Sequence, residues 1–499
     1  MMNPPVFFGA GGFVVALIFF GGLWTGVARE LFNATLEFIT LHLGWYYVLT
    51  VTFFFFFVIW LYFSPYGGIK LGGENARPEF NRPAWFTMLF AAGMGMGMVF
   101  WGVAEPIKHY SNPPFAEPFT MTAAKEAMRF SFFHWGFHPW AIYIIFGLGI
   151  AYFHFRHGLP LAPRSLLYPI VGDRFKGWLG HAADIICTVG TLLGVATSLG
   201  LGAMQINSGL NRLLAVGYDL HIQVVIIAVI TAIAITSIVS GLDRGIKYLS
   251  ITNIALMFVL MSFVFWAGPT LYQIRLFITT LGDYLQNIVE TSLWIDVGPD
   301  SSWQTDWTLF YWGWWLSWSP FVGVFIARIS KGRTIREFIF YIFLVPSLAT
   351  LLWFAVFGGT ALYLELNGLG TISSIVDENV AMSLNALLRY LPLASITQWL
   401  GLFLIVIFFI TSSDSGSLVD DMVTSGGHPN PPVAQRIFWG SAEGAAAAVM
   451  LVVGGLKALQ AASLSAGLVQ SFLLLASCYG LTKALRSDKG ARSIVRSSQ

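Results

Sequence analysis

Long stretches without charged side chains are the feature that most constrains the fold of this chain. Eleven segments of more than 20 residues contain no Asp, Glu, Lys or Arg, and a twelfth, 437–456, contains only Glu443. The eleven segments are 1–28, 38–69, 83–104, 130–155, 185–211, 220–242, 248–274, 307–327, 338–364, 390–413 and 458–482. Because about 20 apolar residues cross the hydrocarbon core of a bilayer as a helix, each segment is long enough to span it.

The fold class predicted from these segments is all-α, a polytopic membrane protein with 12 transmembrane helices. Helices satisfy their own backbone hydrogen bonds inside lipid, where no water is available. Only 10% of the residues are charged, which excludes one large soluble enzyme. The formal net charge of +2 gives no reason to expect a nucleic-acid partner.

The distribution of basic residues predicts the orientation in the membrane. With both termini inside, 19 of the 27 Lys and Arg residues fall in cytoplasmic loops and the C-terminal tail, and eight fall outside. Cytoplasmic loops carry an excess of Lys and Arg, so the N- and C-termini are expected to be cytoplasmic. We therefore expect a multi-pass protein of the cell inner (plasma) membrane.

Two of the apolar segments contain residues that disfavour a continuous helix. Segment 91–97 places three glycines at alternate positions, and the eighth span contains Ser319-Pro320 at mid-depth. Gly weakens a helix interior and Pro removes a backbone hydrogen bond. Spans 3 and 8 each begin a set of five, and interrupted helices at corresponding positions indicate a transporter with inverted repeats. The alternative is that the glycines only allow close helix packing.

Aromatic residues cluster within two charge-free spans. Trp135, Trp140 and Tyr143 fall within about 140° of arc on a helix, and the eighth span has five aromatic residues between 311 and 318. Ring faces bind a quaternary ammonium by cation–π attraction without a charged partner. The scarcity of acids in the spans fits this binding mode, because a carboxylate is costly there. The alternative is that these rings serve packing or the interfacial belts.

Five motifs together resemble the betaine/choline/carnitine transporter family over roughly residues 1–485. They are AAGMGMG at 91–97, FHWGFHPWAIY at 133–143, WGWWLSWSPF at 312–321, ARISKGRTIREF at 327–338 and TSSDS at 411–415. The resemblance implies a LeuT-like 5+5 inverted repeat of helices 3–7 and 8–12, with two preceding helices. It also implies a homotrimer that carries out secondary transport of a small quaternary ammonium or similar zwitterionic substrate, and no enzymatic activity.

The expected organisation follows from the spans and this resemblance. An amphipathic surface helix is predicted around Ile278–Leu293. The predicted units are two N-terminal helices with their loop (1–82), the first repeat (83–272), the surface helix and loop (273–306), the second repeat (307–482) and a short basic cytoplasmic tail (483–499).

The resemblance also implies the binding residues. The implied substrate-binding residues are Trp135, Trp140, Tyr143, Trp315, Trp318, Gly93, Gly95 and Gly97. The implied sodium ligands are Ala91, Met94, Phe408, Thr411 and Ser412. A possible second sodium site includes Thr191 and lies near Phe321, but Val195 stands where the family has a second hydroxyl, which puts this site in doubt.

The expected function is sodium-coupled import of glycine betaine or a near analogue by alternating access, with sodium as coupling ion and no other cofactor. Choline-specific, proton-coupled relatives tend to have Asp at the position of Gly97, so a zwitterion fits better than choline. The alternative is a proton-coupled importer of choline, another onium compound or ectoine.

Two further features have competing interpretations. His134 and His138 have the spacing of two metal ligands on a helix, but no third ligand is evident, so no transition-metal site and no catalytic residue is expected. Glu443 is interpreted either as a proton relay or as an acid near the cytoplasmic end that snorkels or pairs locally.

Overall fold

All regular secondary structure in the described part of the chain is helical. The computed structural model describes residues 2–93, 95–239, 243–298, 302–428 and 431–488, and within them the sole β feature is an isolated bridge between Lys70 and Thr334. Ten helices or joined helix pairs in these residues are long and apolar enough to cross a membrane. They are α1 (Pro4–Leu23), α2 (Thr25–Phe63), α5 (Met121–Trp135) with α6 (Phe137–His157), α8 (Trp178–Leu214), α9 (Leu220–Val239), α10 (Asp243–Ala267), α14 (Ile335–Leu366), α17 (Ala394–Thr424), α18 (Val433–Gly454) and α19 (Leu456–Ser487).

The two other predicted spans are also helical, and together they complete the predicted twelve. The third span consists of α3 (Arg82–Gly93) and α4 (Met96–Ser111), separated at the glycine-rich segment. Gly95 there is fully extended, with φ −141° and ψ 175°. The predicted interruption of this span is therefore confirmed. The eighth span is α13 (Phe310–Arg328), which is rich in tryptophan.

The predicted interruption of the eighth span at Ser319-Pro320 is wrong. Helix α13 continues through Pro320 without a break. Proline removes the N–H that would bond the carbonyl of Leu316, but the Ser319 hydroxyl donates to that carbonyl at 2.7 Å. Because the freed carbonyl has a new donor, the helix stays continuous, as transmembrane helices with proline commonly do.

The fourth span is interrupted instead, at a position that the apolar pattern does not reveal. Helices α5 and α6 meet at Gly136, whose φ of −90° and ψ of −123° are not helical. A side chain at Gly136 would lie 2.5 Å from the carbonyl oxygen of Phe132 and 2.9 Å from the Tyr284 hydroxyl. Glycine therefore permits both the bend and the close packing at this point.

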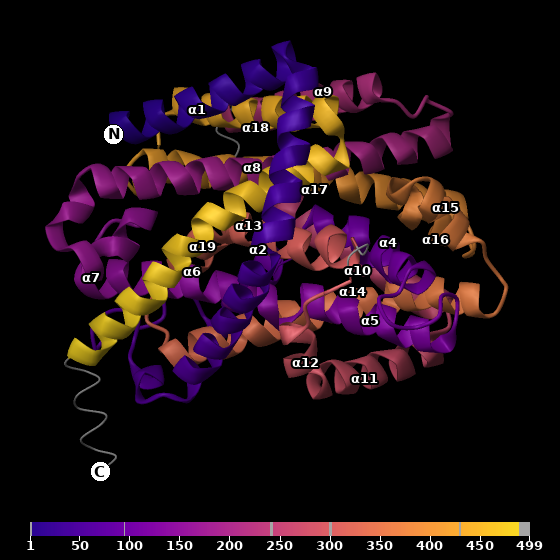
Figure 1. Cartoon of the computed structure of the whole chain (residues 1–499), viewed down its shortest axis with the longest axis horizontal. Coiled ribbons are helices and arrows are strands. Elements are labelled where there is room, and N and C mark those ends of the chain that lie inside the picture. The colour runs from indigo at the N-terminus through magenta and orange to yellow at the C-terminus, as the bar shows by residue number, and fades with distance from the viewer. Residues whose placement is uncertain (1, 94, 240–242, 299–301, 429–430, 489–499) are drawn as a thin grey trace.

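The amphipathic surface helix is present but begins earlier than predicted. Helix α11 (Thr270–Gln286) starts after Pro269, and α12 (Ile288–Leu293) follows Asn287. Figure 1 shows both at one edge of the bundle. The shorter helices α7 (Tyr168–Val171), α15 (Ile372–Glu378) and α16 (Ser383–Leu388) lie in connections between the spans.

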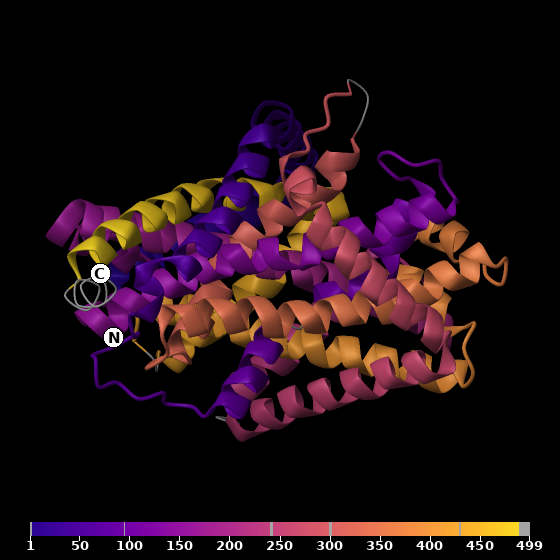
Figure 2. The same ribbon diagram turned by 90° about the horizontal axis from the view of Figure 1, so that it is seen from below.

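Helices that are distant in the sequence pack together in the bundle interior. Helix α13 packs mainly against α6 and α19, and α17 packs mainly against α8 (Figures 1 and 2). The start of α1 and the end of α19 lie at the same end of the bundle in both views. At that end the Asn3 amide donates to the Thr424 carbonyl and Arg156 binds Asp488 at 2.5 Å. The α13–α6 contact brings the aromatic residues of the two spans together.

Candidate functional site

A cavity lies where α4, α6 and α13 meet, and aromatic rings form most of its wall. About 450 Å³ inside it is free of protein atoms. Its lining residues are Gly95, Gly97, Met98, Trp135, Pro139, Trp140, Tyr143, Trp314, Trp315, Trp318 and Thr350. The residues in this set are buried, apart from the partly buried Gly95, so the cavity lies in the interior of the bundle.

All five aromatic residues predicted to bind substrate line this one cavity. The Trp135 and Trp315 rings meet at a centroid distance of 4.9 Å and an interplanar angle of 75°. Tyr143 stands at 80° to Trp315 with centroids 6.5 Å apart, and at 79° to Trp140 with centroids 5.3 Å apart. Rings at steep angles turn several faces toward a shared space, which is the arrangement that binds a quaternary ammonium.

Hydrogen bonds to protein acceptors hold most of the indoles in place. Trp315 Nε1 donates to the His134 carbonyl at 3.0 Å, and Trp135 Nε1 donates to Glu105 at 2.7 Å. Trp318 differs, because its buried Nε1 has no hydrogen-bond partner among the described residues. Trp318 therefore has a buried donor left for a ligand.

The glycines bring the start of α4 to the cavity. Gly95 and Gly97 line it, and Gly93 is the last residue of α3. A Cβ at Gly97 would lie 2.5 Å from Trp314 Cη2 and 3.2 Å from Trp135 Cη2, so only glycine allows these rings so close. The first amides of a helix lack partners within that helix and carry partial positive charge. The N-terminus of α4 therefore offers an anion-binding end beside the rings.

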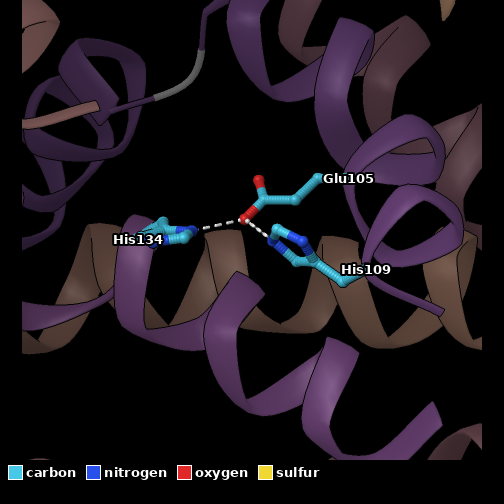
Figure 3. A group of neighbouring side chains, drawn as sticks. All are labelled: Glu105, His109 and His134. Atoms are coloured by element: carbon cyan, nitrogen blue, oxygen red, sulfur yellow. Dashed lines mark hydrogen bonds and ion pairs between the residues drawn. The ribbon is translucent and has the colours of Figure 1, made fainter. Parts of the chain in front are cut away.

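A fully buried carboxylate stands directly behind this wall, contrary to the expectation that the rings act without nearby acids. Glu105 of α4 lies one residue beyond the predicted charge-free segment and has no exposed surface. Its Oε2 accepts from Trp135 Nε1 at 2.7 Å and from the Tyr311 hydroxyl at 2.6 Å. Its Oε1 lies 2.7 Å from His134 Nδ1 and 3.2 Å from His109 Nε2 (Figure 3). Four donors from three helices compensate the desolvation of this one acid.

Sequence reasoning missed Glu105 because it classified residues by segment. Its contacts to His134 and Tyr311 join residues 29 and 206 positions apart, which no local pattern reveals. One signal was present: His109 lies four residues after Glu105, so both face the same side of α4. Met98, Pro139, Trp314 and Thr350 also line the cavity and were not predicted.

Glu105, His109 and His134 are the one group of three potential metal ligands found within 4.8 Å of one another in the described residues. The 2.7 Å contact between His134 Nδ1 and Glu105 Oε1 is a hydrogen-bond distance, with room for a proton between the two atoms. His134 Nε2 also lies 2.9 Å from the Thr308 hydroxyl. His138, the other half of the suspected spacing, lies apart from this group and contacts the Ser292 hydroxyl at 2.8 Å. These hydrogen bonds give both histidines structural partners.

The predicted sodium ligands lie on two elements, α17 and the segment that includes the end of α3. Phe408, Thr411 and Ser412 lie on α17, and the Thr411 hydroxyl donates to the carbonyls of Ile407 at 2.9 Å and Phe408 at 3.3 Å. Ala91 lies in the last turn of α3, and Met94 lies outside the described residues.

The start of α4 and the neighbour of Phe408 both reach one point on α8. A Cβ at Gly202 would meet Met96 Sδ and would also lie 3.1 Å from Phe409 Cδ2. Met96 of α4 and Phe409 of α17 therefore meet the same point of α8.

The two residues of the possible second sodium site lie on different helices, α8 and α13. Thr191 is buried on α8 and its hydroxyl has no hydrogen-bond partner among the described residues. Phe321 on α13 packs edge-on against Trp318 at 5.3 Å. Val195, one turn after Thr191, lies against Gly416 of α17.

Glu443 does not snorkel to the membrane surface. Its side chain has no exposed area, and Oε2 accepts from the Ser417 hydroxyl at 3.0 Å and from the Ser413 hydroxyl at 3.4 Å. The expected local pairing is therefore found as hydrogen bonds from two hydroxyl groups.

Comparison with known proteins agrees with this geometry. The sequence model of the betaine/carnitine/choline family transporters matches residues 5–490. The chain is 44% identical to a glycine betaine transporter of Bacillus subtilis over 492 residues, covering 96% of each protein. It is 43% identical to a glycine betaine/proline/choline/ectoine transporter of Vibrio parahaemolyticus, covering 98% of this chain and 88% of that one. It is 46% identical to an uncharacterized transporter of Mycobacterium tuberculosis, covering 98% of this chain and 84% of that one.

Proposed function

The chain belongs to the betaine/carnitine/choline transporter family, and we propose that it imports glycine betaine or a closely related compatible solute. Its relatives are transporters rather than enzymes. The observation that carries the proposal is the interior cavity lined by tryptophan rings, with the start of α4 beside them. This pairing matches a small molecule with a methylated cation at one end and a carboxylate at the other.

The two ends of such a solute have different partners in the cavity. The rings of Trp135, Trp140, Tyr143 and Trp315 hold the trimethylammonium group by cation–π attraction, worth about 0.5–2 kcal/mol for each well-placed ring. The first amides of α4 receive the carboxylate, as helix N-termini do for anions. Choline has a hydroxyl in place of this carboxylate and leaves the start of α4 without an anion.

Sodium coupling is the second part of the proposal. The α17 hydroxyls of Thr411 and Ser412, together with carbonyls near the α3–α4 break, are hard oxygen donors of the kind that sodium prefers. Sodium bound there stabilises the broken segment in the conformation that binds substrate. The inward sodium gradient then drives uptake against the solute gradient.

The wider architecture that we propose follows the family. Helices 3–7 and 8–12 form two inverted five-helix repeats of the LeuT type that move against each other in alternating access, and three copies form a homotrimer. The burial of the side chains that line the cavity supports alternating access, because a substrate held among them needs an opening motion to enter and leave. The excess of basic residues in one set of loops supports a cytoplasmic position for both termini.

The experiment is uptake of labelled glycine betaine into proteoliposomes that contain the purified protein. We expect accumulation with an inward sodium gradient and little uptake when potassium replaces sodium. Equal uptake under both conditions would refute sodium coupling, and no uptake of any solute in a competition panel would refute the function. Trp315→Ala should weaken substrate binding by roughly 3- to 30-fold, measured by tryptophan fluorescence, because the central ring of the wall is lost.

A broader substrate range is the second candidate. The Vibrio parahaemolyticus relative has a name that includes proline, choline and ectoine, at 43% identity. A competition panel of these solutes against labelled glycine betaine ranks them directly. Strong competition by choline combined with dependence on a proton gradient would favour a proton-coupled onium importer.

A further inference from the structure

Three carboxylates are buried together between α8, α17 and α18, in addition to the acid behind the aromatic cavity. Asp420 and Asp421 come from α17 and Glu443 comes from α18, and none of them has exposed surface. Glu443 contacts the hydroxyls of Ser413 and Ser417 on α17, and Asp420 lies three residues after Ser417, on the same face of that helix. We call Asp420 and Glu443 the acid pair. An ionised carboxylate in such a place needs a compensating charge or hydrogen-bond donors.

Hydrogen-bond donors compensate the acid pair only in part. Two serine hydroxyls reach Oε2 of Glu443, as described above. Oε1 of Glu443 has no hydrogen-bond partner among the described residues, and neither do the two carboxylate oxygens of Asp420. Two donors for four buried oxygens do not support two negative charges.

The neighbouring cations are engaged with other acids. Arg436 of α18 lies 3.8 Å from Asp421 and 4.0 Å from Asp414. Arg164, from the short helical turn before α8, binds Asp184 at 2.5 Å. No ion pair to the acid pair occurs within the part of the chain that the structure describes. Its charge is therefore not balanced by a protein cation.

The helices packed around the acid pair bring few other titratable groups. Helix α8 contributes Cys187, whose thiol interacts electrostatically with Asp420 and Asp184. Helix α9 faces α18 with the uncharged Thr231, which contacts Gly444. Helix α1 has no titratable side chain, and the described side chains of α10, residues 248–267, include no Asp, Glu, Lys or Arg. The acid pair therefore has Asp421, Asp414 and Arg436 as its other charged neighbours.

Two unpartnered hydroxyls on α8 make up a second, independent observation. Thr188 and Thr191 are buried, and neither hydroxyl has a hydrogen-bond partner among the described residues. With Val195 they follow the spacing of one helix face. Val195 on that face lies against Gly416 of α17, and a Cβ on Gly416 would also lie 3.1 Å from Glu443 Oε1. The α8 face that meets α17 therefore presents polar atoms without partners toward the same region.

We propose that the acid pair is a proton-binding site that holds one proton between its two carboxylates and exchanges it during each transport cycle. Binding changes the pair from two negative charges to one, and the proton comes from water and returns to water. Adjacent buried carboxylates share a proton because they cannot both ionise. A divalent metal fits less well, because the one three-ligand cluster within 4.8 Å in the described residues is at Glu105, His109 and His134.

The position of the acid pair gives the proton a role in transport. Helix α17 carries both Asp420 and the proposed sodium ligands Thr411 and Ser412, so a movement of α17 during the cycle alters both sites. Arg436 is partly exposed, with 18% of its side-chain surface accessible, and it connects the region of the pair to the surface through Asp421. The proton thus becomes a second coupling ion, an idea that rests on the proposed function for its transport readout.

The first test reads the proton directly and does not depend on the substrate. Infrared spectra of the full chain in lipid, recorded across a pH titration, should contain a protonated-carboxyl C=O band. Glu443→Gln and Asp420→Asn should each shift this band or change its intensity, because each removes one of the two carboxylates that share the proton, whereas the control Glu30→Gln at an exposed site leaves it unchanged. A band that is unchanged in both variants, or no band in the unmodified protein, would overturn the proposal. The two variants also guard against a folding failure of either one.

The second test measures transport in proteoliposomes with a fixed sodium gradient and zero membrane voltage. An inward proton gradient should raise glycine betaine accumulation by up to about tenfold per pH unit, the limit for one coupled proton. Glu443→Gln should keep sodium-driven uptake and lose this increase. An equal increase in Glu443→Gln would overturn the proton site. Absence of uptake under every gradient would instead refute the proposed function, and the infrared result would then decide the proton site alone.

Discussion

Replacing Glu105 by glutamine tests whether the buried acid positions the aromatic wall. The substitution keeps the size of the side chain and removes its charge. A hydrogen bond to a charged acceptor contributes about 1.5–3 kcal/mol, and a neutral one about 0.5–1.5 kcal/mol. The bonds from Trp135 Nε1 and Tyr311 Oη to Oε2 each therefore lose about 1 kcal/mol, or about 2 kcal/mol together. If this loss is transmitted to the cage, Glu105→Gln raises the Kd for glycine betaine roughly 5- to 30-fold.

The assay is a titration of tryptophan fluorescence with glycine betaine in the presence of sodium. Trp135→Phe provides the matched control, because it removes the Nε1 donor and keeps an aromatic ring. If Glu105 acts through Trp135, the double variant should bind about as weakly as Trp135→Phe alone, which is the signature of coupled residues. A Kd for Glu105→Gln within twofold of the unmodified protein would refute the reasoning, as would additive effects in the double variant. Glu105→Ala should fail to fold, because it leaves four buried donors without an acceptor.

Three further outcomes follow from contacts around the cavity. Gly97→Ala should cut uptake by at least tenfold without unfolding the protein, because its Cβ would lie 2.5 Å from a tryptophan ring. The control is Gly12→Ala, since a Cβ there would have no neighbouring atom within 4 Å. Normal uptake in Gly97→Ala would contradict the proposed close approach. Trp318→Phe removes the unpartnered Nε1 donor and should weaken binding of glycine betaine more than binding of choline, measured by competition. Equal weakening of both would show that this donor does not recognise the carboxylate. Val195→Thr adds a hydroxyl one turn from Thr191 and should make the sodium dependence of uptake steeper, whereas an unchanged Hill coefficient would argue against a second site.

The spans were predictable because crossing lipid is a local requirement. An apolar segment such as that of α14 must satisfy its backbone within itself, so its length and composition suffice to identify it. The break before α4 was also predictable, because three closely spaced glycines each destabilise the helix at the same point. The continuity of α13 was not, because it depends on the orientation of the Ser319 hydroxyl. Apolar content alone cannot report such a side-chain bond.

The aromatic residues of the wall could be predicted, but the buried acid that holds them in position could not. Trp135 and Trp315 belong to dense aromatic motifs that stand out in the sequence, and the structure places both at the cavity. The support comes from Glu105, whose partners lie on three helices and meet only when the bundle forms. Similarly, Glu443 was visible as an isolated acid, but the neighbouring Asp420 could be recognised only once α17 and α18 were packed together. Contacts between helices far apart in the sequence therefore account for most of what was missed.

The ring-faced wall of the cavity is also expected to disfavour the binding of some small cations. Indole rings present π faces and N–H donors, and the indoles of Trp135 and Trp315 already donate to protein acceptors. A primary ammonium such as that of free glycine brings three N–H groups that must give up water, and ring faces provide no strong acceptors for them. A methylated nitrogen has no such groups to satisfy. We therefore expect free glycine and other primary amines to compete poorly with a methylated solute.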